Sequence, residues 1–444
     1  MDTPIADFAR RYAASGAARL HMPGHKGRPF LGCEALDITE IAGADALYEA
    51  SGIIAESEKN AGALFGSGRT LYSTEGSSQC IRAMLYLALT CRPGGTAPVI
   101  VAARNVHKAF VYAAALLDLE VVWLWPEGDC RSICGCPVSP ETVERTLSAL
   151  PAPPAAVYVT SPDYLGGMAD IAALAEVCHR HGTVLAVDNA HGAYLRFLRP
   201  SAHPLDLGAD ICCDSAHKTL PVLTGGAYLH IGKHAPEGFS EHAKAALALF
   251  GSTSPSYLTL ASLDLCNRYL AGEYSRRLAE TAARLAETRR RLNANGWQME
   301  DTDPLRLTLR APAGLAGAAL AERLRTGGVE CEYADGEFLV MMLTPENDAG
   351  DLERLRTALG ENHRPAAEIQ ALPAARGERV LSIRQALFAP HETVPADKAL
   401  GRVCGAPTVS CPPAIPVVVS GERIGPEGLA LFARYGVREV DVLL

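Results

Sequence analysis

IAALAEVCHRHG (171–182), TVLAVDNAHG (183–192) and ADICCDSAHKTLP (209–221) are the segments from which the architecture follows most directly. The first has helical spacing and stops at a glycine, while the second and third are apolar strands that break into polar turns. Strands that are apolar on both faces and separated by helices are typical of a mostly parallel sheet covered on both sides. The sequence therefore predicts an α/β fold, with polar side chains at the carboxyl ends of its strands.

The alternation of strand and helix extends over about residues 61–260, which we predict to be the large domain. Apolar runs predict further strands at 97–103, 120–125 and 155–161, and helical spacing covers 111–119. Residues 1–60 form a separate N-terminal segment that we expect to be irregular, because HMPGHKGRPF (21–30) is rich in turn-forming residues, with short helical patterns after that stretch.

The pattern changes after residue 260, where we predict a smaller α+β domain over 261–365 and a C-terminal domain over 366–444. One long charged helix is expected over 261–295. Within the small domain the pattern predicts strands at 305–311, 329–333 and 337–343 and helices at 313–328 and 348–360. The C-terminal domain carries the Pro-rich segment CPPAIPVVVSGERIG (411–425), then a short helix and a final strand.

Composition narrows the class of protein. The chain has 444 residues, of which 48% are hydrophobic and 20% charged, so a substantial core can be buried. Its 41 basic and 50 acidic residues give a net charge of −9, which argues against a protein that coats nucleic acid or a polybasic membrane protein. No apolar run reaches about 18 residues, and the N-terminus lacks the apolar stretch of a signal peptide. We therefore predict a cytoplasmic protein.

Cysteine usage agrees with that expectation. Thirteen cysteines are scattered along the chain, and without an export signal we expect reduced, mostly buried thiols. The closest group is Cys130, Cys134 and Cys136, and a zinc site there lacks a fourth ligand at suitable spacing. No metal site is predicted.

Four polar segments of the α/β region carry candidate chemistry. YSTEGSSQ (72–79) precedes a helical pattern, and a Gly followed by hydroxyl residues at a helix N-terminus suits a phosphate group. Asp188 follows one strand and can hold a cationic ring nitrogen, and Lys218 follows another and can act as a nucleophile toward an aldehyde. His107, after the strand at 97–103, can stack on a flat cofactor.

Each segment also has an ordinary structural explanation when taken alone. The serines can be a helix N-cap, Asp188 a turn former, Lys218 a solvated surface residue and His107 a loop histidine. Their order decides between the two interpretations. A phosphate loop, a stacking His, a carboxylate after a strand and then a Lys thirty residues later is the layout of a pyridoxal-phosphate (PLP) enzyme, whose cofactor requires a Lys Schiff base and an acidic partner for its pyridine nitrogen.

Longer segments make the resemblance specific. HMPGHKG, DITEIAGADAL, SPDYLGGMADI, DNAHGA, SAHKTLP and STSPSYLTLASLD resemble the Orn/Lys/Arg decarboxylase family over about residues 18–262. SIRQALFAPHETVPADKALGR and PPAIPVVVSGERI resemble that family's C-terminal domain. The chain is most similar to the short members, which lack the N-terminal wing domain. The resemblance implies a fold-type I PLP enzyme that decarboxylates a basic amino acid, with no nucleic-acid or membrane partner.

The resemblance also implies roles for individual residues. Lys218 forms the Schiff base, Asp188 pairs with the pyridinium nitrogen, and His217 is a candidate proton donor or phosphate and substrate contact. The remaining cofactor contacts implied are Gly76, Ser77, Ser78 and Ser215 at the phosphate, and Ala190 and His107 on opposite faces of the ring. Ser254 is expected to reach a partner's site, because fold-type I sites lie at a dimer interface. A homodimer or a higher multiple of dimers follows.

Some positions depart from the family pattern. Cys411 replaces a Tyr and Ala414 a Gly in the tail motif, and Ala406 stands near the place of a Glu. Tyr48 and Gln385 replace a His and a Glu. These regions can shape the substrate end of the pocket, so lysine, arginine and ornithine all stay open as substrates, as does a non-standard amino acid.

Two other functions compete with decarboxylation. Another fold-type I reaction, such as an aminotransferase or a β-eliminating lyase, shares Lys218 and Asp188 but releases no CO2. A non-catalytic regulatory homologue is supported only by the altered tail. GALFGSGRT (62–70) is not a nucleotide-binding loop, because the spacing of its glycines is one residue too long and Arg69 replaces the required Lys.

Overall fold

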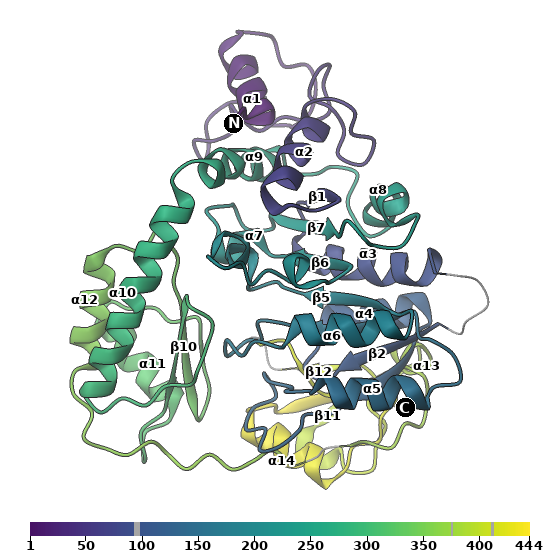
Figure 1. Cartoon of the computed structure of the whole chain (residues 1–444), viewed down its shortest axis with the longest axis vertical. Helices are drawn as coiled ribbons and strands as arrows, with labels where there is room; N and C mark the ends of the chain where they lie inside the picture. The colour runs from purple at the N-terminus through teal and green to yellow at the C-terminus, as the bar shows by residue number, and fades with distance from the viewer. Residues whose placement is uncertain (93–97, 374–375, 410–412) are drawn as a thin grey trace. The chain divides into compact units, whose positions relative to one another are not determined.

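The structure is a computed structural model of the chain, and it describes residues 1–92, 98–373, 376–409 and 413–444. The chain divides into two compact units. The first unit consists of residues 1–95 and 171–278, and the second of residues 96–170 and 279–444. Because the boundaries fall inside the α/β region, each unit contains strands and helices of that region together with further elements of its own (Figure 1).

The first unit is built on strands in the order β1-β7-β6-β5. These are β1 (Arg69–Ser73), β7 (Ala227–Ile231), β6 (Ile211–Asp214) and β5 (Val184–Asp188). β5 and β6 are parallel, with Asp188 opposite Cys213, whereas β7 runs antiparallel to both β6 and β1. Nearly every residue of these strands is buried, as expected for a sheet covered on both faces.

Helices surround these strands. They include α2 (Ile53–Phe65), α3 (Gly76–Thr90), α6 (Ile171–Arg180), α7 (Ala216–Thr219), α8 (Phe239–Leu249) and α9 (Tyr257–Ala271). Local sequence sets several of their ends. α2 stops at Gly66, which has φ +67°, and the Ser256 side chain caps α9 by accepting from the Thr259 backbone N–H.

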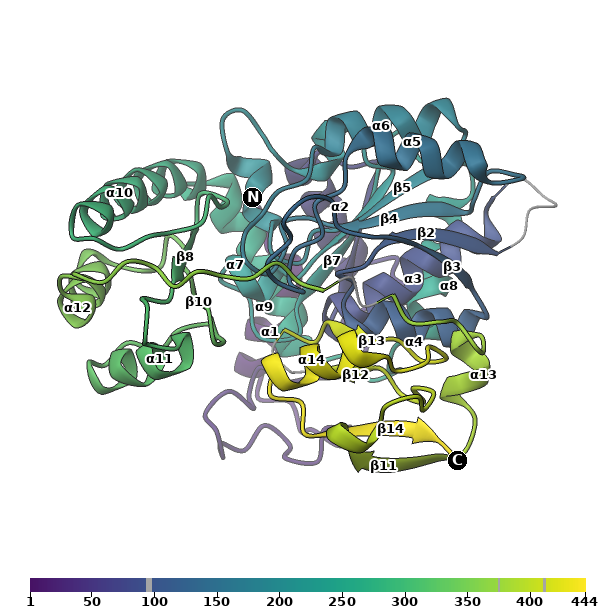
Figure 2. The same cartoon turned by 90° about the horizontal axis from the view of Figure 1, so that it is seen from below.

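The second unit contains the parallel strands β4 (Ala156–Thr160), β2 (Val99–Ala103) and β3 (Glu120–Leu124), in that order. Figure 2 shows β2 beside β4. The accompanying helices are α4 (Lys108–Leu117) and α5 (Pro140–Ala149). α5 begins at Ser139, whose side chain accepts from the Thr142 backbone N–H, with a proline in the first helical turn.

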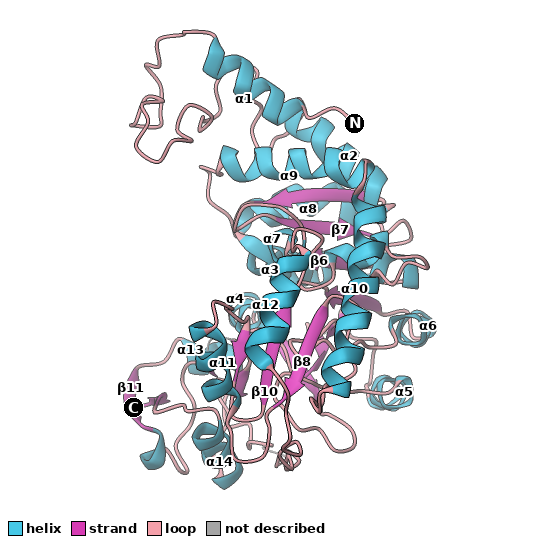
Figure 3. Ribbon diagram, turned by 90° about the vertical axis from the view of Figure 1, so that its left-hand side faces the viewer, coloured by secondary structure: helices cyan, strands magenta, loops and turns pink. Residues whose placement is uncertain are grey.

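A smaller antiparallel sheet, in the order β8-β10-β9, follows in the second unit. Its strands are β8 (Arg306–Arg310), β9 (Tyr333–Ala334) and β10 (Phe338–Met342). The helices α11 (Gly317–Thr326) and α12 (Ala349–Leu359) accompany it (Figure 3). α12 starts with a reciprocal capping box between Asp348 and Asp351, which satisfies backbone N–H groups that have no partner inside the helix.

The C-terminal part of the second unit forms two short antiparallel pairs, β11 (His391–Pro395) with β14 (Glu439–Leu443) and β12 (Thr408–Val409) with β13 (Pro416–Val418). The helices α13 (Ile383–Leu387) and α14 (Pro426–Arg434) accompany them. This part has its own apolar core, formed by Ala399, Cys404, Val417, Val418, Ile424, Leu431, Phe432, Val440 and Val442.

The α/β fold predicted from the sequence is confirmed, and most of its predicted strands are present within a residue or two of the expected bounds. The single helix predicted over 261–295 is wrong. The chain instead forms α9 and then α10 (Tyr274–Ala294), with a break at Gly272, whose φ of −97° and ψ of −107° are not helical. Helical spacing continues across the break, but glycine allows the chain to leave the helix there.

Two smaller expectations also differ. In residues 1–60, α1 (Pro4–Ala14) lies before the turn-rich stretch, where no helix was predicted, whereas the start of α2 agrees with the short helical patterns expected after it. The strand expected over 329–333 is reduced to β9, which begins at Tyr333. Among the residues that the structure describes, no helix is both long and apolar enough to cross a lipid bilayer.

Candidate active site

Lys218 lies on the short helix α7, immediately beyond the carboxyl end of β6. The turn is closed by a backbone hydrogen bond from Lys218 N to Ser215 O at 3.0 Å. The Lys218 side chain is half-buried, and its Nζ lies 2.8 Å from Nε2 of His191. An amine held beside an imidazole, at the end where α/β sheets bind ligands, is equipped for nucleophilic and proton-transfer chemistry.

Asp188 is the last residue of β5 and is almost completely buried. Its Oδ1 accepts a hydrogen bond from the Ala190 backbone N–H at 3.2 Å. The next residue, Asn189, donates its backbone N–H to Cys213 O at 3.0 Å, so the turn after β5 is tied to β6. A buried carboxylate at this place can balance a cationic ring nitrogen.

The predicted phosphate loop begins α3. Gly76 has φ +71°, which favours glycine, and its N–H donates to Gly225 O at 2.7 Å. Gly225 is needed as well, since a Cβ there would lie 2.6 Å from Thr74 O. The Ser215 hydroxyl donates to the Ser77 hydroxyl at 2.7 Å, so the phosphate loop and the turn that carries Lys218 are in direct contact.

Those hydroxyls sit where an anion binds most readily. The N-terminus of α3 carries Gly76, Ser77 and Ser78 on its first turn, with backbone N–H groups that have no partner inside the helix. The helix dipole adds partial positive charge there. The first unit thus brings a lysine amine, a buried carboxylate and an anion-binding helix end onto neighbouring loops, a donor set that suits an aromatic cofactor bearing a phosphate.

The remaining predicted residues have the following positions. His217 lies on α7, where its Nδ1 is 3.0 Å from Gly226 O. Ser254 lies in an exposed loop, with its N–H donating to Ser252 Oγ at 3.1 Å. His107 belongs to the second unit, where it caps α4 by accepting from the Ala109 N–H at 3.1 Å. Their roles toward a cofactor stay predictions.

The sequence analysis missed His191. Its sequence position, inside the turn DNAHG after β5, placed it among the polar residues at a strand end, but nothing in the pattern indicated that it meets Lys218 across 27 residues. The side chain is buried. His191 therefore joins the candidate catalytic residues.

Arg104, which precedes His107, anchors the tail motif within the second unit. Its guanidinium donates to Pro416 O at 2.8 Å and Val417 O at 3.0 Å and lies 3.7 Å from a carboxylate oxygen of Glu422. Lys108 N donates to Ala414 O at 2.9 Å. The loop after β2 and the segment around residue 414 are therefore joined by buried hydrogen bonds.

The positions that depart from the family pattern can now be placed. Ala414 has φ +60°, so the backbone keeps a conformation that favours glycine although the residue is alanine. Gln385 forms a capping box with Ser382, a role that Glu and Gln share. Tyr48 accepts a hydrogen bond from Gln79 at 2.8 Å, and Ala406 O accepts one from the Cys404 thiol at 3.0 Å. Cys411 lies outside the described residues.

Known proteins resemble the chain over nearly its whole length. The family model for Orn/Lys/Arg decarboxylase, major domain, matches residues 3–311. An arginine decarboxylase from Bacillus subtilis is 30% identical, over 97% of this chain and 92% of the relative. The uncharacterized protein YaaO of the same organism is 29% identical, over 98% of this chain and 94% of the relative.

Solved structures show the same fold. The constitutive lysine decarboxylase of Escherichia coli has a TM-score of 0.80 at 18% identity, covering 100% of this chain and 82% of that one. The serine palmitoyltransferase of Sphingomonas wittichii has a TM-score of 0.56 at 16% identity, with coverages of 81% and 82%. The family match and the relatives agree, and the chain belongs to the Orn/Lys/Arg decarboxylase family of enzymes.

Proposed function

We propose that this enzyme uses PLP to decarboxylate a basic amino acid, and that arginine is its substrate. The observation that carries the proposal is the contact of 2.8 Å between Lys218 Nζ and His191 Nε2, on a turn that is hydrogen-bonded to the phosphate loop. Arginine is favoured because relatives named arginine decarboxylase align over at least 95% of this chain. The altered tail motif is the reason to test lysine and ornithine beside it.

PLP, when bound, acts as an electron sink for the bond that breaks at Cα. Lys218 would hold the cofactor covalently, and Asp188 would keep its ring nitrogen protonated. Gly76, Ser77, Ser78 and Ser215 would bind the phosphate through N–H and hydroxyl donors, and Ala190 and His107 would contact the ring faces.

The residues beside the Lys218 amine are the candidates for proton transfer. Formation of the amine requires a proton at the Cα that has lost CO2, so a proton donor must lie beside that carbon. Lys218 Nζ and His191 Nε2 can exchange a proton over 2.8 Å, so this pair is the proposed donor to Cα. His217, one residue from Lys218, is the second candidate.

A second copy of the chain is the proposed partner. Large apolar side chains are exposed along the loop at 20–31: Leu20 at 94%, Met22 at 68%, Phe30 at 82% and Leu31 at 89%. The loop is nevertheless ordered, since the Glu34 carboxylate accepts from the N–H groups of Phe30 and Gly32 at 2.8 Å. An ordered apolar loop of this kind is typical of a protein interface. We propose that it docks on a second copy, and that Ser254 reaches the partner's site.

The first experiment is to incubate the purified protein with PLP and separately with arginine, lysine, ornithine and diaminopimelate, and to measure amines by mass spectrometry and CO2. We expect the decarboxylated amine from arginine to exceed the others by at least tenfold. In a parallel incubation with pyruvate added as amino acceptor, the keto acid of the amino acid without CO2 would support an aminotransferase instead. PLP binding without any product would support a non-catalytic regulatory homologue.

The assembly is tested separately by light scattering on a size-exclusion column. Wild-type protein is expected to have the mass of a dimer or a multiple of it, and Leu31→Asp is expected to shift it toward the monomer. Glu141→Ala, an exposed change on α5 of the second unit, is the control and is expected to leave the mass unchanged.

A further inference from the structure

Asp214, the last residue of β6, is the centre of a buried polar cluster that the proposed mechanism does not use. Its Oδ2 lies 3.1 Å from His203 Nε2 and 3.2 Å from His230 Nε2. Its Oδ1 accepts from Asn189 Nδ2 at 2.7 Å. All four side chains are completely buried, so this carboxylate has exchanged water for three protein donors.

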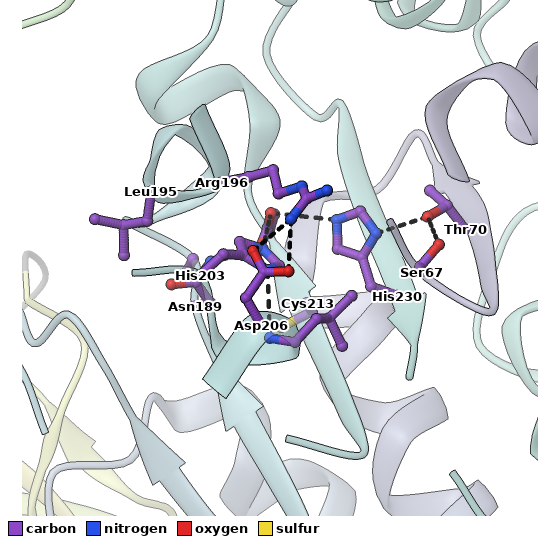
Figure 4. Close-up of polar contacts among 12 residues, drawn as sticks. Ser67, Thr70, Asn189, Leu195, Arg196, His203, Asp206, Cys213 and His230 are labelled. Carbon is purple, nitrogen blue, oxygen red and sulfur yellow. Dashed lines mark hydrogen bonds and ion pairs between the residues drawn. The ribbon is translucent and has the colours of Figure 1, made fainter. Parts of the chain in front are cut away.

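The cluster continues outward to β1, and Figure 4 shows His230 joined to Thr70, and Thr70 to Ser67, by successive polar contacts. The Thr70 hydroxyl lies 2.8 Å from His230 Nδ1, and the Ser67 hydroxyl lies 2.7 Å from that of Thr70. On the other side, the Leu205 backbone N–H approaches His203 Nδ1 at 3.4 Å. A backbone N–H can only donate, so Nδ1 of His203 is an acceptor and its hydrogen sits on Nε2, facing Asp214.

The charges support an ionised Asp214. Burial by itself would raise the pKa of Asp214, but the two histidines beside it lower that pKa well below its ordinary value. Burial lowers the pKa of His230, against the opposing effect of Asp214. The imidazoles therefore serve as hydrogen-bond donors to a carboxylate.

Two histidines and an aspartate are also a possible ligand set for a metal ion. Such a site requires the ring nitrogens that face its centre to carry lone pairs. Nε2 of His203 carries a hydrogen instead, because its Nδ1 is committed to the Leu205 N–H. The arrangement therefore fits a hydrogen-bonded network better than a metal site.

This network touches both turns of the candidate active site. Asn189, held by Asp214, stands between Asp188 and Ala190 in the turn after β5. Asp214 itself is followed by Ser215 and then by α7 with Lys218. The buried Asp214 is thus hydrogen-bonded to the turn that follows Asp188, and it also begins the turn that carries Lys218.

We propose that Asp214, together with His203 and His230, is a positioning unit that fixes the turn of Asp188 relative to the turn of Lys218 and so preforms the cofactor site. The inference rests on the proposed function, since it concerns residues assigned to PLP. A fully buried carboxylate is rigid because moving any donor leaves part of its charge unpaired. The turns after β5 and β6 then keep one relative position before the cofactor arrives.

The same strand offers a matched control at its other end. Asp210, just before β6, is buried and also bonds a histidine, with its Oδ2 3.1 Å from His179 Nε2 and accepting from Leu185 N–H at 2.8 Å. Asp210 lies at the end of the strand away from Lys218. Asp210→Leu removes an equivalent carboxylate without touching either turn of the site.

The test compares Asp214→Leu with Asp210→Leu by melting temperature and by the PLP dissociation constant of the apoprotein, measured from cofactor absorbance and tryptophan fluorescence. We expect both variants to melt lower than wild type. Asp214→Leu is expected to bind PLP at least tenfold more weakly, whereas Asp210→Leu stays within twofold of wild type. Equal PLP affinities in the two variants would overturn the proposal.

If Asp214→Leu does not fold, Asp214→Asn and the swap Asp214→Asn with Asn189→Asp replace it. The single variant keeps an amide oxygen toward both imidazoles but removes the buried carboxylate, whereas the swap restores a carboxylate, at residue 189, opposite the new amide N–H of residue 214. The swap is expected to recover most of the PLP affinity that the single variant loses. No recovery would overturn the proposal.

Three further outcomes distinguish the positioning unit from a metal site and from a failure of the proposed function. Stoichiometric metal in wild-type protein, measured by plasma mass spectrometry and lost in Asp214→Asn, would replace the positioning unit with a metal site. Failure of wild-type apoprotein to bind PLP would overturn the proposed function, and the positioning role with it. Wild-type binding with unchanged Asp214 variants would overturn the positioning role alone.

Discussion

Lys218 Nζ and His191 Nε2 lie 2.8 Å apart, although 27 residues separate them in the chain. The contact exists because β5 and β6 are parallel neighbours, so the turns that follow them lie side by side. It gives the proposed nucleophile an adjacent group that can accept or return a proton.

His191 should therefore affect catalysis more than folding. We expect His191→Phe, which keeps a ring but removes the nitrogen, to lower kcat by about 100-fold, the lower end for a lost acid–base group. His191→Gln, which keeps a hydrogen-bonding end beside the Lys218 amine but no acid–base group, should recover only the part of that loss that comes from holding the amine in place. The measurements are steady-state kinetics and the rate at which apoprotein combines with PLP. Equal activities of the Phe and Gln variants would contradict a hydrogen-bonding role.

Lys218 is expected to be the covalent attachment point of the cofactor. Lys218→Ala should show no turnover and no mass gain after borohydride reduction in the presence of PLP, because the amine proposed to bond the cofactor is gone. Intact-protein mass spectrometry measures the adduct. Lys233→Ala, an exposed lysine of the same unit, is the control and should be labelled like wild type. Substantial turnover by Lys218→Ala would refute the assignment.

Asp264 should make stability depend on pH. Its carboxylate is completely buried and accepts from the N–H groups of Ile5 at 2.9 Å and Ala6 at 3.0 Å. Burial raises the pKa of Asp264 to about 6, from an ordinary value of 3.8. The folded protein therefore holds this proton more tightly than the unfolded chain, and its stabilising contribution, complete below pH 3.8, is lost as the pH rises through about 6.

The variant Asp264→Asn removes that ionisation. Relative to wild type, it should gain stability by on the order of 3 kcal/mol between pH 4 and pH 7. Urea unfolding at several pH values measures the difference. Asp129→Asn, at an exposed loop position, is the control. A constant difference between Asp264→Asn and wild type across this range would show that Asp264 does not titrate as expected.

Arg104 should be essential for the stability of the second unit. Arg104→Met leaves the Pro416 and Val417 carbonyls without their donor and Glu422 without its nearby cation. Breaking a buried pair on one side typically costs about 3–5 kcal/mol. The double variant Arg104→Met with Glu422→Gln should be less destabilised than the single one, since the uncompensated charge is gone. Chemical denaturation measures the free energy of unfolding of both variants. Equal losses in the two would show that the unpaired charge of Glu422 does not contribute to the destabilisation.

Ala414 should tolerate glycine better than other buried alanines. Its φ of +60° costs a non-glycine residue about 1–2 kcal/mol, so Ala414→Gly relieves strain while losing one buried methyl group. We expect its stability to equal or exceed wild type. Ala399→Gly is the matched control, because Ala399 is also buried but has φ −87°, and it should be destabilised by about 1 kcal/mol. Equal losses in both variants would contradict the strain at residue 414.

The N-terminal helix shows why part of the fold escaped prediction. α1 begins after Thr3 with Pro4 at its first position, residue types that commonly start a helix, but the Thr3 side chain makes no capping bond. Asp264 of α9 supplies that cap across 259 residues, through its bonds to Ile5 and Ala6. A donor or acceptor supplied from so far along the chain leaves no local pattern. The prediction of one helix over 261–295 failed for the opposite reason. Here the local pattern was present, because helical spacing continues across the break at Gly272, but the chain leaves the helix there.

The α/β alternation, the family and the residue types at the strand ends could all be predicted without a structure, because apolar periodicity and short motifs are local properties of the chain. Lys218, Asp188 and the serines after Gly76 were all identifiable in this way. Only the tertiary structure placed His191 against Lys218, joined Ser77 to Ser215, and gathered Asn189, His203 and His230 around Asp214. Those contacts depend on which strands become neighbours, and strand order arises from the packing of the whole sheet rather than from any one segment.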